Sequence, residues 1–298
     1  MNAASHWTTD KERGTSLAVR AIVWVTALLG RPFGRLMLFP VTAYFWLSST
    51  ARRRASAQYL QAVFGRRARA AETFRHYLCF AQVLLDRALL LRGARDTFAI
   101  RVNNGDVVMA AVSEGRGCIL MGAHFGSYDV LRAAAELTGL RIKILMRVET
   151  TERFNAVMAS LNPAWNDHVI PLGRTDTMLL AKEHLRGGGV LGLLGDRLTA
   201  RDKEVGARFF GRPAPFPAGP YLLAQALDAP LVAFFGAYQG GNRYGIRFER
   251  LDLRNTDTGS LAAMGAASFA AQLEAACRAT PYNWFNFYDF WARATPDA

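Results

Sequence analysis

The sequence predicts an α/β protein, with a mixed, mostly parallel central sheet flanked by helices and preceded by a helical N-terminal region. Three observations predict it. From residue 97 onward, short apolar runs alternate with amphipathic stretches, as in strands that alternate with covering helices. Residues 1–75 carry twelve Lys or Arg against three acidic residues, between apolar runs rich in aromatic side chains. The 298 residues are 51% hydrophobic, which supports a sizeable core and excludes a disordered chain.

We divide the chain into a helical membrane-associating region, residues 1–95, and an α/β domain, residues 96–298. The net charge of +12 is concentrated in the first quarter, which could attract nucleic acid or an anionic membrane surface. The apolar runs between the charges favour the membrane, so we expect no nucleic-acid partner. The three cysteines have neither a paired framework nor a metal-ligand spacing, which favours a reducing compartment and predicts no metal site.

Two apolar runs, residues 17–29 and 36–47, are separated by Gly30-Arg31-Pro32. Each is shorter than the roughly 20 residues of a spanning helix. If they formed one span, Arg31 and Arg35 would lie in mid-bilayer at a cost of about 2.5–3.5 kcal/mol each. The long polar leader fits a signal peptide poorly. We therefore expect two helices lying in the membrane interface, with the arginines at the headgroups. The alternative is a helical hairpin packed on the main domain.

The remaining elements follow from periodicity and turn residues. Helices are expected at 52–64 and 71–92, after Asn104 as N-cap, and at 127–138, 151–160, 175–186, 218–228 and 260–279. Strands are expected at 98–102, 117–122, 141–147, 168–171, 189–194, 230–238 and 243–249. The arginines around the 52–64 helix are either a solvated face or a binding site for anionic headgroups.

A His and an Asp lie where the strand 117–122 ends. If Ser127 caps the next helix, Asp129 falls in its first turn, where the helix dipole favours a carboxylate. Gly126 would let the chain fold tightly enough for Asp129 to reach the imidazole of His124. A carboxylate on one ring nitrogen leaves the other nitrogen free as a base. The spacing alone also fits a surface His beside a helix cap.

Residues 117–129 resemble the HxxxxD block of the lysophospholipid acyltransferase superfamily, and more specifically of its bacterial lipid A biosynthesis (lauroyl/myristoyl) branch. Residues 185–197 resemble the Gly-rich strand of that branch, which ends in an acidic block, and residues 209–214 resemble its next block. The order and spacing match over about residues 100–250. His6-Trp7 with Arg13-Gly14, together with residues 283–288, look like a subgroup sometimes found with aryl-polyene pigment clusters.

This resemblance implies an acyltransferase at the cytoplasmic face of a bacterial inner membrane, bound in a peripheral or monotopic manner. It would move an acyl group from a thioester, carried by acyl carrier protein or CoA, to a hydroxyl or amine of a membrane lipid or glycolipid. His124 would be the general base and Asp129 the acid that orients it. No cofactor is implied beyond the acyl thioester co-substrate. Acyl carrier protein and an anionic membrane surface are the expected partners.

The resemblance also implies substrate-binding residues: Gly126, Arg147, Asp196, Arg197, Phe210 and Arg212. Asp196 matches the acid that ends the Gly-rich strand and should support the site. The family often has Gln after this acid, whereas this chain has Arg197. Pro215-Phe216-Pro217 follows the third block where the family often has Thr, so acceptor recognition departs from the family pattern. Arg147 ends a predicted core strand, where ligands gather in parallel sheets; the alternative is an ordinary arginine at a strand end.

Two other functions are compatible with the sequence. A thioesterase or lipase would use water in place of the acceptor, although no Gly-x-Ser-x-Gly elbow is present. A non-catalytic membrane lipid-binding protein would retain the site as a relict. The seven aromatic residues between 282 and 291 fit either core packing or an acyl-chain wall.

Overall fold

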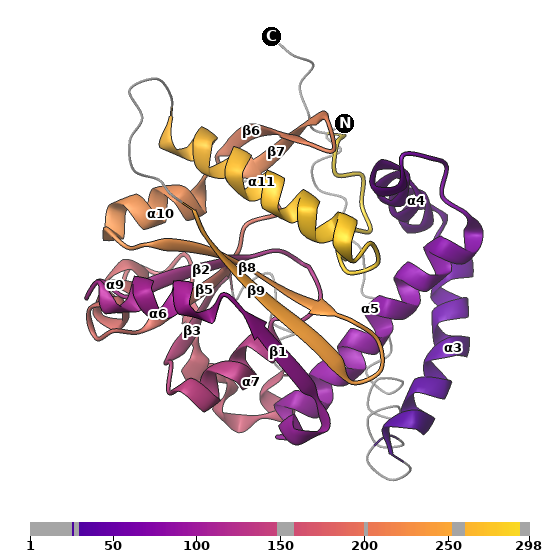
Figure 1. Cartoon of the computed structure of the whole chain (residues 1–298), viewed down its shortest axis with the longest axis horizontal. Coiled ribbons are helices and arrows are strands. Elements are labelled where there is room, and N and C mark those ends of the chain that lie inside the picture. Colours follow the sequence, from indigo (N-terminus) through magenta and orange to yellow (C-terminus); the bar gives the residue numbers. More distant parts are fainter. Residues whose placement is uncertain (1–25, 27–29, 148–157, 200–201, 252–259, 293–298) are drawn as a thin grey trace.

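The structure is a computed structural model that describes residues 26, 30–147, 158–199, 202–251 and 260–292. A seven-stranded sheet with the order β1-β9-β8-β2-β5-β3-β4 forms its centre (Figure 1). The strands are β1 (Ala99–Asn103), β2 (Cys118–Gly122), β3 (Ile142–Met146), β4 (Val169–Pro171), β5 (Val190–Leu194), β8 (Leu231–Tyr238) and β9 (Arg243–Leu251). Within this seven-stranded sheet the β8–β9 pair is antiparallel, and the other described pairs are parallel. The predicted fold class, a mixed and mostly parallel sheet flanked by helices, is confirmed.

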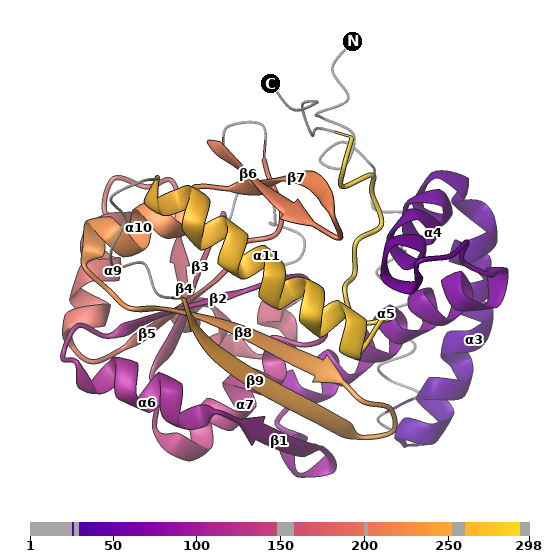
Figure 2. The ribbon, with the colours of Figure 1, turned by 45° about the horizontal axis from the view of Figure 1, so that its top comes forward.

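Both faces of the sheet are buried, and β2 shows how. Its alternate residues Ile119 and Met121 join one core, whereas Cys118 and Leu120 join the other. The first core includes α9 (Thr177–Arg186), α10 (Gly219–Leu227) and α11 (Leu261–Ala279). The second includes α6 (Gly105–Ser113) and α7 (Asp129–Thr138), which lie on the opposite side of the sheet from α11 (Figure 2). Continuous apolar strands therefore mark the centre of the sheet.

A separate hairpin, β6 (Glu204–Phe209) and β7 (Arg212–Pro217), was not predicted. Its prolines argue against a strand from sequence alone. Phe209 pairs with Arg212 across a two-residue loop, so these two residues form a hydrogen-bonded pair. Pro213, Pro215 and Pro217 then occupy the intervening positions, whose N–H groups would point away from β6. The prolines consequently cost the hairpin no ladder hydrogen bond.

Three N-terminal helices are described: α3 (Arg31–Ser48), α4 (Thr50–Phe64) and α5 (Ala70–Leu91). They stack beside the sheet domain, with α5 between α3 and the strands (Figures 1 and 2). No helix among the described residues is long and apolar enough to cross a bilayer. The predicted run at 17–29, apart from Thr26, lies outside the described residues, as does most of the helix expected at 151–160.

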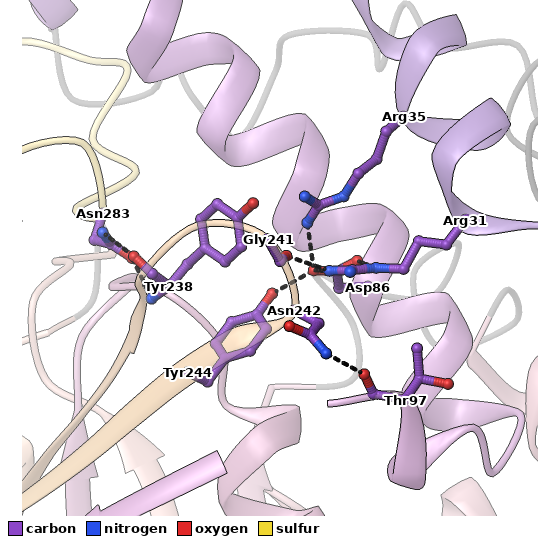
Figure 3. Close-up of polar contacts among 9 residues, drawn as sticks. All are labelled: Arg31, Arg35, Asp86, Thr97, Tyr238, Gly241, Asn242, Tyr244 and Asn283. Atoms are coloured by element: carbon purple, nitrogen blue, oxygen red, sulfur yellow. Dashed lines mark hydrogen bonds and ion pairs between the residues drawn. The ribbon is translucent and has the colours of Figure 1, made fainter. Parts of the chain in front are cut away.

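Arg31 and Arg35 do not point outward, in contrast to the expected headgroup contacts. Both point from α3 toward Asp86 on α5 (Figure 3). Arg31 binds both carboxylate oxygens, at 2.8 and 2.7 Å, and Arg35 binds Oδ2 at 3.2 Å. The hydroxyl of Tyr244 on β9 also donates to Oδ2 (2.9 Å). Asp86 is fully buried, so the cluster joins α3, α5 and the β8–β9 hairpin through one carboxylate.

Candidate active site

The turn after β2 is held from two sides. Gly126 has a φ of 56°, and a Cβ there would overlap the carbonyl oxygen of Gly236 on β8. The Ser127 N–H donates to that same oxygen (2.8 Å). On the other side, the Gly126 N–H donates to Asn283 O (2.8 Å), and the Phe285 N–H donates to His124 O (2.7 Å). Glycine is therefore required at position 126 for both its conformation and its close contact with β8.

His124 is bonded to Asp196, which follows β5. Because β2 and β5 are adjacent and parallel, both residues lie at the carboxyl edge of the sheet. The ring Nδ1 lies 2.8 Å from Asp196 Oδ1, and the backbone N–H of His124 donates to Oδ2 (3.0 Å). A carboxylate accepts hydrogen bonds, so Nδ1 carries the proton and Nε2 has a free lone pair. The side chain of His124 remains 32% exposed, which leaves it accessible to a substrate.

Burial and the nearby arginines favour the neutral form of the imidazole. Burial lowers the pKa of His124, and the nearby Arg197 and Arg87 lower it further, although Asp196 opposes them. Burial alone would raise the pKa of Asp196. The interactions with His124 and Arg197 and the hydrogen bond from Trp284 outweigh burial and bring the pKa of Asp196 to about 2. At neutral pH the pair is a carboxylate bonded to a neutral imidazole.

Asp129 occupies a different place from the one expected. Its carboxylate forms an ion pair with Arg87 Nε of α5 (2.9 Å) and is 2% exposed. Its other oxygen, Oδ1, has no hydrogen-bond partner among the described residues. Asp129 does begin α7, but Tyr128 is the N-cap residue and Ser127 makes no capping bond. The Asp129 carboxylate is paired with Arg87, and the imidazole is bonded to Asp196. Asp196 therefore takes the position that we expected for Asp129.

Asn104 likewise sits at the N-cap position of α6, as expected, but its side chain makes no capping bond. Instead its amide donates across to Phe248 O (3.5 Å).

Arg197 and Arg147 lie at the same sheet edge. Arg197 donates to Phe285 O (2.8 Å), and its guanidinium lies over the Tyr288 ring, 5.6 Å from the centroid. Arg147 follows β3, next to β5, and pairs with Asp202 (3.2 Å). The structure thus groups these arginines with His124 and Asp196. Their substrate-binding roles stay predictions.

Phe210 and Arg212 lie on the β6–β7 hairpin instead. Phe210 has a φ of 52° and packs against Tyr59 of α4, with 6.4 Å between ring centroids. The guanidinium of Arg212 lies over the Trp291 ring at 4.7 Å. Among the described residues, no hydrogen bond or ion pair joins either side chain to His124. Their predicted substrate contacts remain untested.

Two residues of the site, Arg87 and Trp284, were missed. Trp284 is fully buried and donates its indole N–H to Asp196 Oδ2 (2.9 Å). Arg87 follows Asp86 in the middle of an apolar helix, and adjacent charges in such a place signal buried partners. In the described ranges no group of three His, Cys, Asp or Glu could hold a metal ion.

A comparison with protein-family models agrees with the resemblance noted in the sequence. The model for bacterial lipid A biosynthesis acyltransferase matches residues 6–293. No curated protein matches the chain. The family implies acyl transfer to a lipid acceptor, and the aryl-polyene-cluster subgroup stays a prediction. The match extends over nearly the whole sequence, so the chain belongs to the bacterial lipid A biosynthesis acyltransferase family.

Proposed function

We propose that this protein transfers an acyl group from a thioester carrier to a hydroxyl or amine of a membrane lipid or glycolipid, with His124 as the general base. The observation that carries the proposal is the partly exposed imidazole of His124, whose Nδ1 is bonded to the buried carboxylate of Asp196. This arrangement leaves Nε2 as the basic nitrogen that would take the proton of a bound acceptor.

The reaction needs no covalent enzyme intermediate. Nε2 takes the proton from the acceptor hydroxyl or amine as its oxygen or nitrogen attacks the thioester carbonyl carbon. The C=O electrons move to oxygen, and the resulting tetrahedral oxyanion collapses with cleavage of the C–S bond. The imidazolium returns its proton to the departing thiolate. The charge of Asp196 stabilises the imidazolium while it exists.

Arg197 and Arg147 supply positive charge at the sheet edge that carries His124. We assign them to anionic groups of the acceptor or the donor. Arg197 stands where the family often has a neutral Gln, so this cation is expected to alter acceptor choice.

The proposal is tested with purified protein, acyl carrier protein and CoA thioesters as separate donors, and a panel of lipid acceptors. His124→Ala should lower the transfer rate about 10²–10⁴-fold. The control is His168→Ala, which replaces the last residue of the 3-10 helix η3 (Pro163–His168) and should leave the transfer rate unchanged. Undiminished transfer by His124→Ala would overturn the mechanism. Thioester hydrolysis at a rate that does not depend on the acceptor would identify a thioesterase. The absence of turnover with every donor would favour a binding protein.

We further propose that α3 places the enzyme on the inner membrane at its cytoplasmic face. Its outward surface carries exposed apolar side chains: Phe33, Leu36, Met37, Phe39, Tyr44 and Leu47. The two charged residues of this 18-residue helix, Arg31 and Arg35, are turned toward Asp86. An uncharged apolar face of this length suits a helix that lies in the membrane interface. The neighbouring arginines Arg54, Arg67 and Arg69 are exposed and would meet anionic headgroups.

Vesicle sedimentation with anionic phospholipids tests this surface. The double variant Leu36→Gln with Leu47→Gln should weaken vesicle binding at least about tenfold, because two apolar side chains that would be buried among the acyl chains are replaced by polar ones. The matched control is Leu179→Gln with Leu222→Gln, two exposed leucines of α9 and α10. Equal effects of the two double variants, or none from either, would refute docking through α3.

A further inference from the structure

The segment 283–286 runs beside the turn after β2 like a short antiparallel strand. Phe125 and Trp284 form an isolated bridge, with hydrogen bonds from Gly126 N to Asn283 O and from Phe285 N to His124 O. The side-chain amide of Asn283 pairs with both backbone groups of Tyr238 on β8, at 2.7 and 3.1 Å (Figure 3). The segment is therefore fixed to the sheet and to the turn together.

Trp284 is the residue of this segment that faces Asp196. Its indole is fully buried and is surrounded by rings of Tyr59, Phe209 and Phe290, with centroids 5.0, 5.2 and 5.0 Å away. Its backbone oxygen is bonded to His76 Nε2 (2.8 Å). These contacts leave the indole N–H a single direction, toward Asp196 Oδ2.

Asp196 accepts three hydrogen bonds within this arrangement. Oδ1 faces His124 Nδ1, whereas Oδ2 accepts from both the His124 backbone N–H and the Trp284 indole. A carboxylate that rotated about its Cβ–Cγ bond would lose the indole and backbone donors together. The indole therefore opposes the rotation that would carry Oδ1 away from the ring.

We propose that Trp284 is a positioning residue for His124, acting through Asp196, and that Asp196 rather than Asp129 is the carboxylate that orients the base. The inference rests on the acyl transfer proposed above. It assigns the aromatic segment 283–286 to the catalytic machinery, beyond its packing role. Asp129 then stabilises the start of α7 through its ion pair with Arg87.

The charged groups that act on the imidazole are Asp196 and Arg197, which follow β5, and Arg87 on α5. Arg87 is in turn paired with Asp129 at the start of α7. Loss of the Trp284 donor concentrates the carboxylate charge on the bond to His124, which should move the acid limb of the kcat/KM profile to higher pH. Asp196→Asn removes that charge, so the same limb should move to lower pH.

Trp284→Phe is the informative variant, and Trp291→Phe is its matched control. Trp291 is also buried in the same aromatic cluster, but its indole N–H has no hydrogen-bond partner among the described residues. Both changes remove the same atoms from the same core. We expect Trp284→Phe to lower kcat/KM about 10- to 100-fold and to move the acid limb, whereas Trp291→Phe should leave the limb in place.

A double variant separates positioning from packing. If Trp284 acts through Asp196, Trp284→Phe should add little to the loss of kcat/KM already caused by Asp196→Asn. Any loss caused by Trp291→Phe should instead multiply with the loss caused by Asp196→Asn. Rates are compared at a temperature where circular dichroism shows every variant folded, and the position of the acid limb does not depend on the folded fraction. The positioning role would be overturned if the losses in kcat/KM from Trp284→Phe and Asp196→Asn multiplied and the acid limb of Trp284→Phe did not move.

Asp129→Asn decides between the two carboxylates. A larger loss than that of Asp196→Asn, with the acid limb shifted to lower pH, would return the orienting role to Asp129. His124→Ala that remains fully active would instead refute the proposed function itself, so the two failures are distinguishable.

Discussion

Replacing Asp86 by Asn should detach α3 from the sheet domain. The substitution keeps the shape of the side chain and removes its charge. Arg31 and Arg35, whose side chains are only 14% and 18% exposed, would then face a neutral amide. The amide nitrogen, a donor, would also replace an acceptor oxygen opposite a guanidinium or the Tyr244 hydroxyl, so that two donors would face each other.

The magnitude follows from this burial. Removing one partner of a buried ion pair costs about 3–5 kcal/mol, because the other charge stays desolvated. The partial exposure of both arginines lets water take over some of the bonds, so we expect a loss of about 3 kcal/mol in the free energy of unfolding. Tyr244→Phe removes one donor and leaves the two arginines in place, with an expected cost of about 1–2 kcal/mol.

Urea unfolding followed by far-UV circular dichroism measures both changes. Asp176→Asn is the control, since its partner Arg174 is 64% exposed and surface pairs contribute less than about 1 kcal/mol. If Asp86→Asn stays within about 1 kcal/mol of the wild type, the carboxylate does not join these elements energetically. Vesicle binding should also weaken, because a detached α3 no longer holds its apolar face outward.

Three further predictions concern the turn, pH and the thiols. Gly126→Ala should cost about 3 kcal/mol in urea unfolding, because its Cβ would overlap Gly236, whereas Gly139→Ala, with φ 70° and nothing near its Cβ, should cost about 1 kcal/mol. Equal costs would refute the contact argument. Burial lowers the pKa of His76 from 6.5 to about 4, so the unfolded chain binds this proton first and stability should fall as the pH drops from 6.5 to 4, by about 3 kcal/mol. His76→Asn should flatten that slope, and an unchanged slope would assign it elsewhere. Cys79 and Cys118 are buried with pKa values raised to about 12, so a thiol reagent should modify them only after denaturation, and rapid labelling of the native protein would contradict this.

Most of the sheet could be predicted because its strands are short apolar runs with clear ends. The seven predicted strands all occur, with bounds that differ by at most two residues. The β6–β7 hairpin was not predicted, because proline lacks the backbone N–H of a ladder hydrogen bond and so argues against a strand. Only the register shows that the missing groups of Pro213, Pro215 and Pro217 would have pointed away from the partner strand.

The sequence indicates the positions of the candidate site residues but not the contacts between them. His124, Asp129 and Asp196 follow from strand ends and from the family blocks, which are local in the sequence. Which carboxylate meets the imidazole depends on tertiary partners: Arg87 comes from a helix in the N-terminal region, and Trp284 lies 88 residues after Asp196. The inward turn of Arg31 and Arg35 was hidden for the same reason, since Asp86 lies more than 50 residues away.

The hydrogen bonds from residues 283–286 to Asp196 and to the turn after β2 join parts of the chain that are synthesised at different times. Asp196 follows His124 by 72 residues, and Trp284 follows Asp196 by 88 more. Segments made first begin to fold first. The strands that carry His124 and Asp196 therefore exist before the ribosome has released the segment that bonds to both. If His124 is the base proposed above, a nascent chain should acquire the bonds that orient it only as residues 283–286 emerge.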